Sequence, residues 1–461
     1  MAAIIVGLIV IALVVTLLLK GYYPQAILFI GGLLLLACTA IFGWGDLLNA
    51  KQTTHFIGFD IFKVFSTGFS SRIAGLGLTL MAIGGFSRYM EHVGASSALF
   101  AVFERPLKAI KSPYLLLGAC FIVSQIMVIF VPSHAGLALL LMVTMYPILI
   151  RSGCSPLSAL GMIGCAQFMD AGPGSGNAIL AAQTAGIDVS EYFVYYQLPL
   201  FIGLVLLLTV VHMVVQRWWD KREGWVFDPN NLKTLAGTKS ADQDKQVPKI
   251  YAILPVIPLF LIICFSKVAG SSIRMDVVTA MVISTIIAIV FELIRLRSFK
   301  EVLGSFKLFF EGMGKILVSV VSLIVCGEFF AAGLIKSGFM GTLISAADQA
   351  GFGLAAMVVV ASILCWIFAF IMGSGNAAFF SFAPLLPSVA KTIGSQVIDL
   401  VFPIQVILSF GRVSSPITGA IVAIAGLAGV SPFQIAKRTC IPMLFATVAT
   451  YIAYFVFYYP N

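Results

Sequence analysis

The chain has 461 residues, of which 60% are hydrophobic and 10% are charged, and its mean hydropathy is +1.05. Soluble proteins carry charge on about a quarter of their residues, so this composition excludes an ordinary soluble domain and also a disordered chain. The formal net charge of +9 reflects few acidic residues rather than a dense basic face, which argues against nucleic-acid binding. The composition therefore predicts a polytopic membrane protein.

Apolar runs as long as a membrane-spanning helix, roughly 17–25 residues, recur along the chain. Residues 1–19 have no preceding basic region and no following small-residue cleavage site, so we interpret them as a spanning helix rather than a signal peptide. Spanning helices are expected near residues 3–19, 26–43, 73–90, 195–216, 250–266, 276–294, 316–335 and 441–458. The eight cysteines stand singly in or beside these runs, a spacing that indicates neither disulfides nor a metal site.

Four further apolar segments are interrupted by Gly, Ser, Pro or Asn. Two are expected to be re-entrant hairpins, 113–150 with its tip at PSHAG (132–136) and 353–390 with its tip at GSGN (373–376). Two are expected to be discontinuous helices, 155–187 broken at DAGPGSGN (170–177) and 398–429 broken at GRVSSP (411–416). Such interruptions at membrane depth are tolerated only where they are buried in protein or line a cavity. The four breaks therefore predict a polar site within the membrane.

The basic residues support this topology. If the polar linker 217–249 is cytoplasmic and each hairpin enters and leaves by one face, most of the 28 Lys and Arg residues fall on the cytoplasmic side. This is the asymmetry that the positive-inside rule describes. Two amphipathic segments, 95–112 and 297–315, are expected to lie at the interface as arms of the hairpins.

The order of the segments repeats in a register near 241 residues. This register pairs Ser133 with Ser374 at the hairpin tips and Ser175 with Ser415 at the breaks, with spacings of 42 and 41 residues from tip to break. Each half then holds three helices, a hairpin, a broken helix and a final helix, and the halves enter from opposite sides. The halves are residues 1–216 and 250–461. An inverted repeat of this kind is typical of secondary transporters, so the expected fold class is an all-α inverted-repeat membrane protein.

Five segments carry a resemblance to a known family: KGYYPQAILFIGGLLLL near the start, SPYLLL (112–117), ILAAQTAG (179–186), IMGSGNAAF (371–379) and SPITGAIVAIAGLAGVSPFQIAKRTCIPM (415–443). The chain resembles, nearly end to end, the DcuC-type anaerobic C4-dicarboxylate carriers of bacteria. The resemblance implies a multi-pass carrier in the lipid bilayer of the bacterial inner membrane, with succinate, fumarate, malate or aspartate as substrate. It also implies a homodimer of the elevator type, as in the wider ion-transporter superfamily.

In that superfamily, hairpin tips with a Ser-Asn-Thr-like motif and the breaks of the discontinuous helices hold substrate and cation. The second tip of this chain, Ser374-Gly375-Asn376, keeps Ser and Asn, whereas the first tip has His134 where Asn would stand. The Ser415-Pro416 pair predicts an N-cap and a half-helix that begins at residue 416. Four half-helix N-termini, each with roughly half a positive charge, would together balance a dicarboxylate dianion.

We expect the dianion to bind where backbone donors, small polar side chains and half-helix N-termini coincide. The expected substrate-binding residues are Ser133, His134, Ser175, Gly176, Asn177, Ser374, Gly375, Asn376, Arg412, Ser414, Ser415 and Thr418.

Ionisable residues inside spanning segments need a reason, because a charge at a helix centre costs about 2.5–3.5 kcal/mol on insertion scales. Arg412 either pairs with a substrate carboxylate or caps carbonyl groups at the end of its helix. Asp170 either coordinates a cation, carries the coupled proton or forms a buried pair with Arg412; His134 is the other candidate for the proton. Glu328 is expected to contact a neighbouring helix rather than to take part in transport.

The predicted function is secondary active transport of C4-dicarboxylates by exchange, or by cation-coupled symport or efflux, with an elevator mechanism. The alternatives are an amino-acid or peptide symporter of the same superfamily and an anion channel. An enzyme or an ATP-driven pump is not expected, because no Walker A, HExxH, GxSxG or dinucleotide motif stands in a plausible context. No cofactor is expected, and the sequence leaves H⁺ and Na⁺ open as coupling ion.

Overall fold

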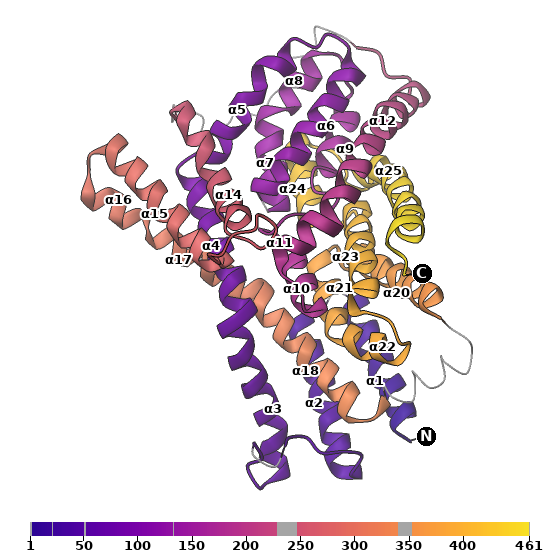
Figure 1. The fold of residues 1–461 in the computed structure, drawn as a ribbon. Coiled ribbons are helices and arrows are strands. Elements are labelled where there is room, and N and C mark those ends of the chain that lie inside the picture. Colours follow the sequence, from indigo (N-terminus) through magenta and orange to yellow (C-terminus); the bar gives the residue numbers. More distant parts are fainter. Residues whose placement is uncertain are drawn as a thin grey trace.

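The computed structural model describes residues 2–20, 22–49, 52–131, 133–227, 247–339 and 353–460. Every regular element in these ranges is helical, and ten helical stretches are long and apolar enough to cross a membrane (Figure 1). The all-helical membrane fold that the composition predicts is thereby confirmed. Most of the expected linker, residues 228–246, lies outside the described residues.

The first half of the chain begins with helices that match the apolar runs. Its elements are α1 (Ala2–Leu19), α2 (Pro24–Phe42), α3 (Ile57–Arg72), the π-helical turn η1 (Ile73–Gly77), α4 (Leu78–His92), α5 (Ala95–Lys108), α6 (Pro113–Phe130), α7 (His134–Thr144), α8 (Tyr146–Arg151), α9 (Pro156–Gly164), α10 (Gly176–Ala185), α11 (Val189–Glu191), the π-helical turn η2 (Tyr192–Gln197) and α12 (Leu198–Arg222). The helix expected near 73–90 is the second part of one continuous stretch, 57–92. Hydropathy misses its first part because α3 carries Asp60, Lys63 and Arg72.

The second half follows a similar order. Its elements are the 3₁₀ helix η4 (Lys249–Val256), α14 (Ile257–Cys264), α15 (Val277–Leu296), α16 (Phe299–Ser305), α17 (Lys307–Ile316), the π-helical turn η5 (Leu317–Val321), α18 (Ser322–Lys336), α20 (Leu354–Met372), α21 (Gly375–Phe382), the 3₁₀ turn η6 (Ala383–Leu385), α22 (Leu386–Thr392), α23 (Val397–Ser414), α24 (Gly419–Ala428), α25 (Pro432–Ala453) and η7 (Tyr454–Tyr458). The arm expected at 297–315 and the span expected at 316–335 form one stretch, 299–336. Helix α25 begins before the expected residue 441, because a capping box of Ser431 and Gln434 starts it.

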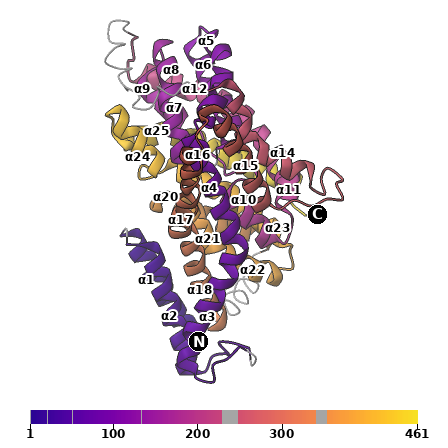
Figure 2. The same ribbon diagram turned by 90° about the vertical axis from the view of Figure 1, so that its left-hand side faces the viewer.

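Helices from the two halves are interleaved in two groups. In the first group, which we call the scaffold (α1–α4 and α14–α18), α2 packs along α18, and α4 packs against α15 and α17. In the second, which we call the break unit (α6–α10 and α20–α24), α23 packs against α10 and α20, and α24 packs against α7 and α9. Figures 1 and 2 show α2 and α3 at one end of the molecule and α5, α6, α8 and α9 at the other.

The scaffold helices α4 and α17 cross at backbone contact. A Cβ atom built on Gly312 would lie 2.4 Å from the carbonyl oxygen of Gly84, so only glycine fits at this crossing. Small residues allow membrane helices to approach in this way. The π-helical turn η1 directly precedes α4, the π-helical turn η5 directly follows α17, and the two turns contact each other. The crossing therefore fixes how the central part of the scaffold faces the break unit.

Candidate functional site

Both expected discontinuous helices are interrupted in the structure. Helix α9 ends at Gly164 and α10 begins at Gly176, while α23 ends at Ser414 and α24 begins at Gly419. The prediction that Ser415 caps a half-helix starting at residue 416 is wrong. The backbone N–H of Ser415 and the hydroxyl of Thr418 both donate to the carbonyl of Arg412, at 3.1 and 2.5 Å. These bonds hold residues 415–418 in a turn, and the half-helix starts after it.

The two expected hairpin tips are capped by the serines that the sequence singles out. The hydroxyl of Ser133 accepts a hydrogen bond from the backbone N–H of Gly136, and that of Ser374 accepts one from Ala377, each at 3.2 Å. Ser175 precedes α10 in the extended conformation of an N-cap, although its side chain makes no capping bond. Three half-helix N-termini, those of α7, α10 and α21, therefore begin at polar residues.

A buried ion pair joins the two interrupted helices. Nη1 of Arg412 lies 3.1 and 3.2 Å from the two carboxylate oxygens of Asp170, and Nη2 donates to the carbonyl of Gln167 at 2.9 Å. Asp170 is 3% exposed and Arg412 is 7% exposed. Of the alternatives that the sequence leaves open for Asp170, the structure shows the buried pair.

Further hydrogen bonds hold Asp170 in the first break. Its carboxylate accepts from Gln167 at 2.8 Å, from Asn177 at 2.5 Å and from Ser409 at 3.4 Å. Its backbone carbonyl accepts from the side chains of Gln197 and Gln405, at 3.0 and 3.2 Å. Sequence reasoning missed these glutamines and Ser409. Their only signal is a polar side chain within an apolar run.

A cavity of about 620 Å³, which we call the central cavity, lies between the break unit and the scaffold. Seven expected site residues line it: Ser133, His134, Asp170, Ser175, Gly176, Asn376 and Arg412. Polar residues that the sequence did not indicate complete the polar lining: Ser87, Arg88, Glu91, Glu311 and Lys315 from the scaffold, and Gln167 from the first break. The structure thus brings both hairpin tips and the first break to one cavity.

The other expected site residues stand behind this lining. Asn177 donates to Asp170, and Ser374 caps α21. Gly375 is buried, and a Cβ atom built on it would lie 3.3 Å from the side chain of Arg412. Three others are buried around the second break and do not line the central cavity: Ser414, Ser415 and Thr418. Their positions indicate support of the site rather than contact with a ligand.

The formal charges that line the central cavity balance. Its three positive side chains are Arg88, Lys315 and Arg412, and its three negative side chains are Glu91, Asp170 and Glu311. Nη1 of Arg88 lies 3.5 Å from the carboxylate of Glu91. The remaining positive potential comes from the N-termini of α7, α10 and α21, which favour an anion at this place. Within the described ranges, no group of three or more His, Cys, Asp and Glu side chains could hold a metal ion.

Substitution of one partner of the buried pair should destabilise the fold more than substitution of both. Arg412→Gln leaves Asp170 as an unpaired buried charge, and breaking a buried pair in this way costs about 3–5 kcal/mol. The double variant Asp170→Asn/Arg412→Gln removes both charges and should recover most of that loss. Unfolding by SDS in mixed micelles measures this comparison. A double variant no more stable than Arg412→Gln would contradict the assigned pairing.

Residues 2–459 match the family described as the C4-dicarboxylate anaerobic carrier, DcuC. The anaerobic C4-dicarboxylate transporters DcuC of Escherichia coli K12 and Shigella flexneri are each 32% identical over 448 residues, which cover 97% of this chain and 95% of the relative. The solved structure of the Alcanivorax borkumensis YdaH transporter has the same fold, with a TM-score of 0.62, 14% identity, and coverage of 93% of this chain and 96% of that one. The ten membrane-length helices within the described part of the chain, together with these relatives, identify a multi-pass protein of the bacterial inner membrane. The chain belongs to the DcuC family of C4-dicarboxylate carriers, which are transporters and not enzymes.

Proposed function

We propose that this protein is a secondary active transporter of C4-dicarboxylates such as succinate, fumarate, malate or aspartate. Family membership supports the substrate class. The observation that carries the proposal is the central cavity, where the tips at Ser133 and Asn376 meet the first break beside Arg412. A dianion there finds backbone and side-chain donors together with helix N-termini. Transport proceeds by exchange or by cation-coupled symport or efflux.

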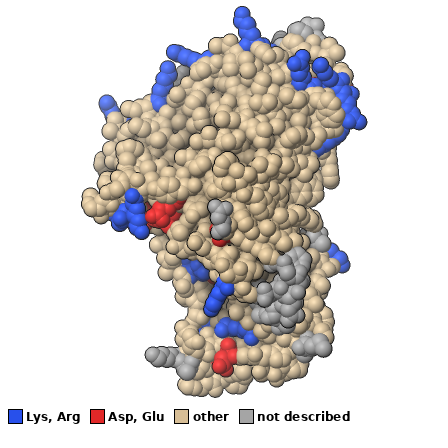
Figure 3. Space-filling view, turned by 45° about the vertical axis from the view of Figure 1, so that its right-hand side comes forward, with Lys and Arg blue, Asp and Glu red and all other residues tan. Residues whose placement is uncertain are grey.

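The hairpins are proposed to be re-entrant, each entering and leaving by one face. In support, Cys154, just after α8, donates from its thiol to the carbonyl of Pro113 at the start of α6, at 3.2 Å. Basic residues in the last turns of α5, α8 and α12 gather at the upper end of the molecule, above a wide surface with few charges (Figure 3). The positive-inside rule then assigns this end to the cytoplasm, together with the linker 217–249.

The two halves are proposed to be inverted repeats, residues 1–216 and 250–461. Their element order supports this, because the π-helical turns η1 and η5 recur close to the expected register, each between scaffold helices. The proposed movement is an elevator step of the break unit along the scaffold. The position of the central cavity between these two units supports it, since sliding there changes which end of the molecule the cavity faces.

The assembly is proposed to be a homodimer, as the resemblance to the superfamily implies. Native mass spectrometry in lipid nanodiscs should give a protein mass of twice 49.4 kDa. A single chain under conditions that preserve transport would contradict it.

Asn376→Ala should weaken dicarboxylate binding. The variant removes one amide at the central cavity, and a hydrogen bond to a charged group contributes about 1.5–3 kcal/mol, which corresponds to roughly a ten- to hundredfold loss of affinity. Ser415→Ala should do less, because Ser415 is buried outside the cavity lining. Calorimetry with succinate measures both, and Asn49→Ala, on an exposed loop, is the control. Unchanged succinate affinity in folded Asn376→Ala protein would refute this placement of the site.

The coupling ion is proposed to be a proton carried at His134 or Asp170, both of which line the central cavity. If His134 carries it, His134→Gln should abolish uptake driven by a pH gradient and spare succinate exchange, because exchange requires no net proton movement. Proteoliposomes loaded with succinate measure both activities, and Asp170→Asn is tested in parallel. Loss of both pH-driven uptake and succinate exchange would indicate that His134 has a structural role or contacts the substrate. Sodium-driven uptake that survives both substitutions would exclude the proton.

A further inference from the structure

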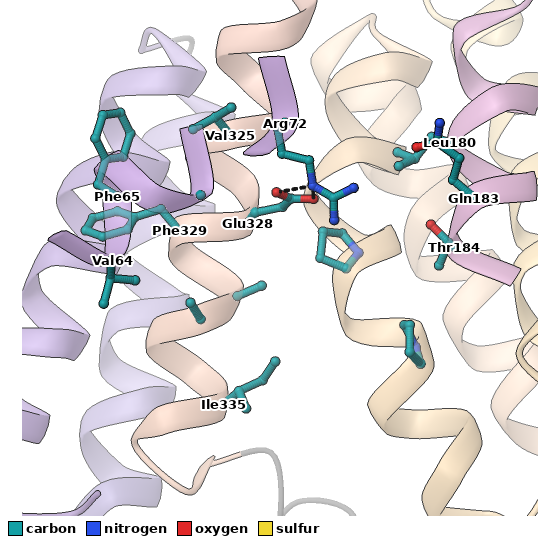
Figure 4. A pocket seen from close by; sticks show the side chains of 15 residues that line it. Val64, Phe65, Arg72, Leu180, Gln183, Thr184, Val325, Glu328, Phe329 and Ile335 are labelled. Carbon is teal, nitrogen blue, oxygen red and sulfur yellow. Dashed lines mark hydrogen bonds and ion pairs between the residues drawn. The ribbon is translucent and has the colours of Figure 1, made fainter. Parts of the chain in front are cut away.

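A second cavity, of about 440 Å³, lies between the scaffold and the break unit and is not used by the proposed site. Helices α3 and α18 form its scaffold side, while α10, η6 and α22 form the other (Figure 4). The polar side chains that line it are Arg72, Gln183, Thr184 and Glu328. Because α3 and α18 belong to membrane-length helical stretches, this polar lining stands among apolar surroundings.

Arg72 and Glu328 form the charged wall of the second cavity. Nε of Arg72 lies 2.6 and 2.7 Å from the two carboxylate oxygens of Glu328, which confirms the expected inter-helix contact of Glu328. The side chain of Arg72 is nevertheless 39% exposed, and that of Glu328 is 17% exposed. Only the Nε edge of the guanidinium meets Glu328, and the rest of the group extends toward the side of Gln183 and Thr184 (Figure 4). Within the described ranges, no hydrogen bond or ion pair engages its two terminal nitrogens.

This geometry suits a carboxylate. The guanidinium fork matches a carboxylate with two parallel N–H donors. Arg72 lies within a membrane-length helical stretch, where an ionisable residue is by default a candidate for a functional site. Glu328 balances the formal charge of Arg72, so the cavity offers directed N–H donors to a carboxylate without a net positive charge.

The two cavities lie one after the other along the same helices. Gly176, at the start of α10, lines the central cavity, and Gln183, further along α10, lines the second. At 1.5 Å per residue these positions are about 10 Å apart along the helix axis. In the repeat register, moreover, Arg72 corresponds approximately to Lys315, which lines the central cavity. Arg72 in the second cavity and Lys315 in the central cavity are thus basic scaffold residues at approximately equivalent positions of the two halves.

We propose that Arg72, with Glu328 beside it, is the carboxylate-binding residue of a second station for the substrate. At this station Arg72 binds the dicarboxylate at the α3 end of the molecule after the break unit has moved. Lys315 binds it at the opposite end. The inference rests on the proposed function and adds to it a residue that determines affinity on one face only.

The test uses the full-length protein in proteoliposomes of one orientation, with radiolabelled succinate exchange measured from each face. Arg72→Gln should raise the half-saturation concentration about tenfold or more on the face nearest α3 and leave the other face unchanged. Lys315→Gln should raise the half-saturation concentration on the opposite face and leave the face nearest α3 unchanged. Arg72→Lys should restore part of the affinity because it keeps the charge. Lys63→Gln, also on α3 but outside the cavity lining, is the matched control and should change neither face.

A second variant keeps the test decisive if Arg72→Gln does not fold. Glu328→Gln removes the competing carboxylate, so it should lower the half-saturation concentration on the α3 face alone. Equal changes on both faces, or none, would overturn the inference while leaving the proposed function intact. A wild-type protein that exchanges no C4-dicarboxylate would overturn the proposed function, and the inference with it.

Discussion

The ion pair between Asp170 and Arg412 is the interaction on which the remaining site geometry depends. It connects the unwound part of the first broken helix to the end of α23, and thereby joins the two halves of the chain. Gln197 and Gln405 bind the same stretch through the backbone carbonyl of Asp170. In a membrane, unwound backbone without such partners would cost several kcal/mol for each unsatisfied group. The pair and its glutamines therefore keep the breaks open and place half-helix N-termini around a cavity.

Balanced charges suit the site of a carrier, because a carrier must both bind and release its substrate. Each of Arg88 and Arg412 has an acidic partner in the central cavity, and Arg72 has one in the second. An excess of unpaired arginines would bind a dianion tightly and slow its release. Partial charges at helix ends and neutral donors such as Asn376 stabilise the anion more weakly. In the proposed mechanism, this weaker stabilisation allows both cavities to bind and release the same substrate.

Local chemistry made part of the site predictable from sequence. Ser133 and Ser374 are recognisable because an N-cap depends on residues next to it in the chain. The start of α24 was not predictable from Ser415-Pro416, because it depends on how Thr418 binds the carbonyl of Arg412. Lys315 and Arg88 reach the central cavity only because Gly84 and Gly312 allow α4 and α17 to cross at backbone contact. The spacing of residues in the sequence does not predict this contact between α4 and α17.

The proposed site places the dicarboxylate between the expected hairpin tips and the first break. A crystal structure of the protein with bromosuccinate, whose bromine gives an anomalous signal, tests it most directly. A bromine peak is expected in the central cavity, within van der Waals distance of Asn376 or of the N-terminus of α10. A well-occupied peak that lies outside both cavities, with the central cavity free of ligand density, would contradict it.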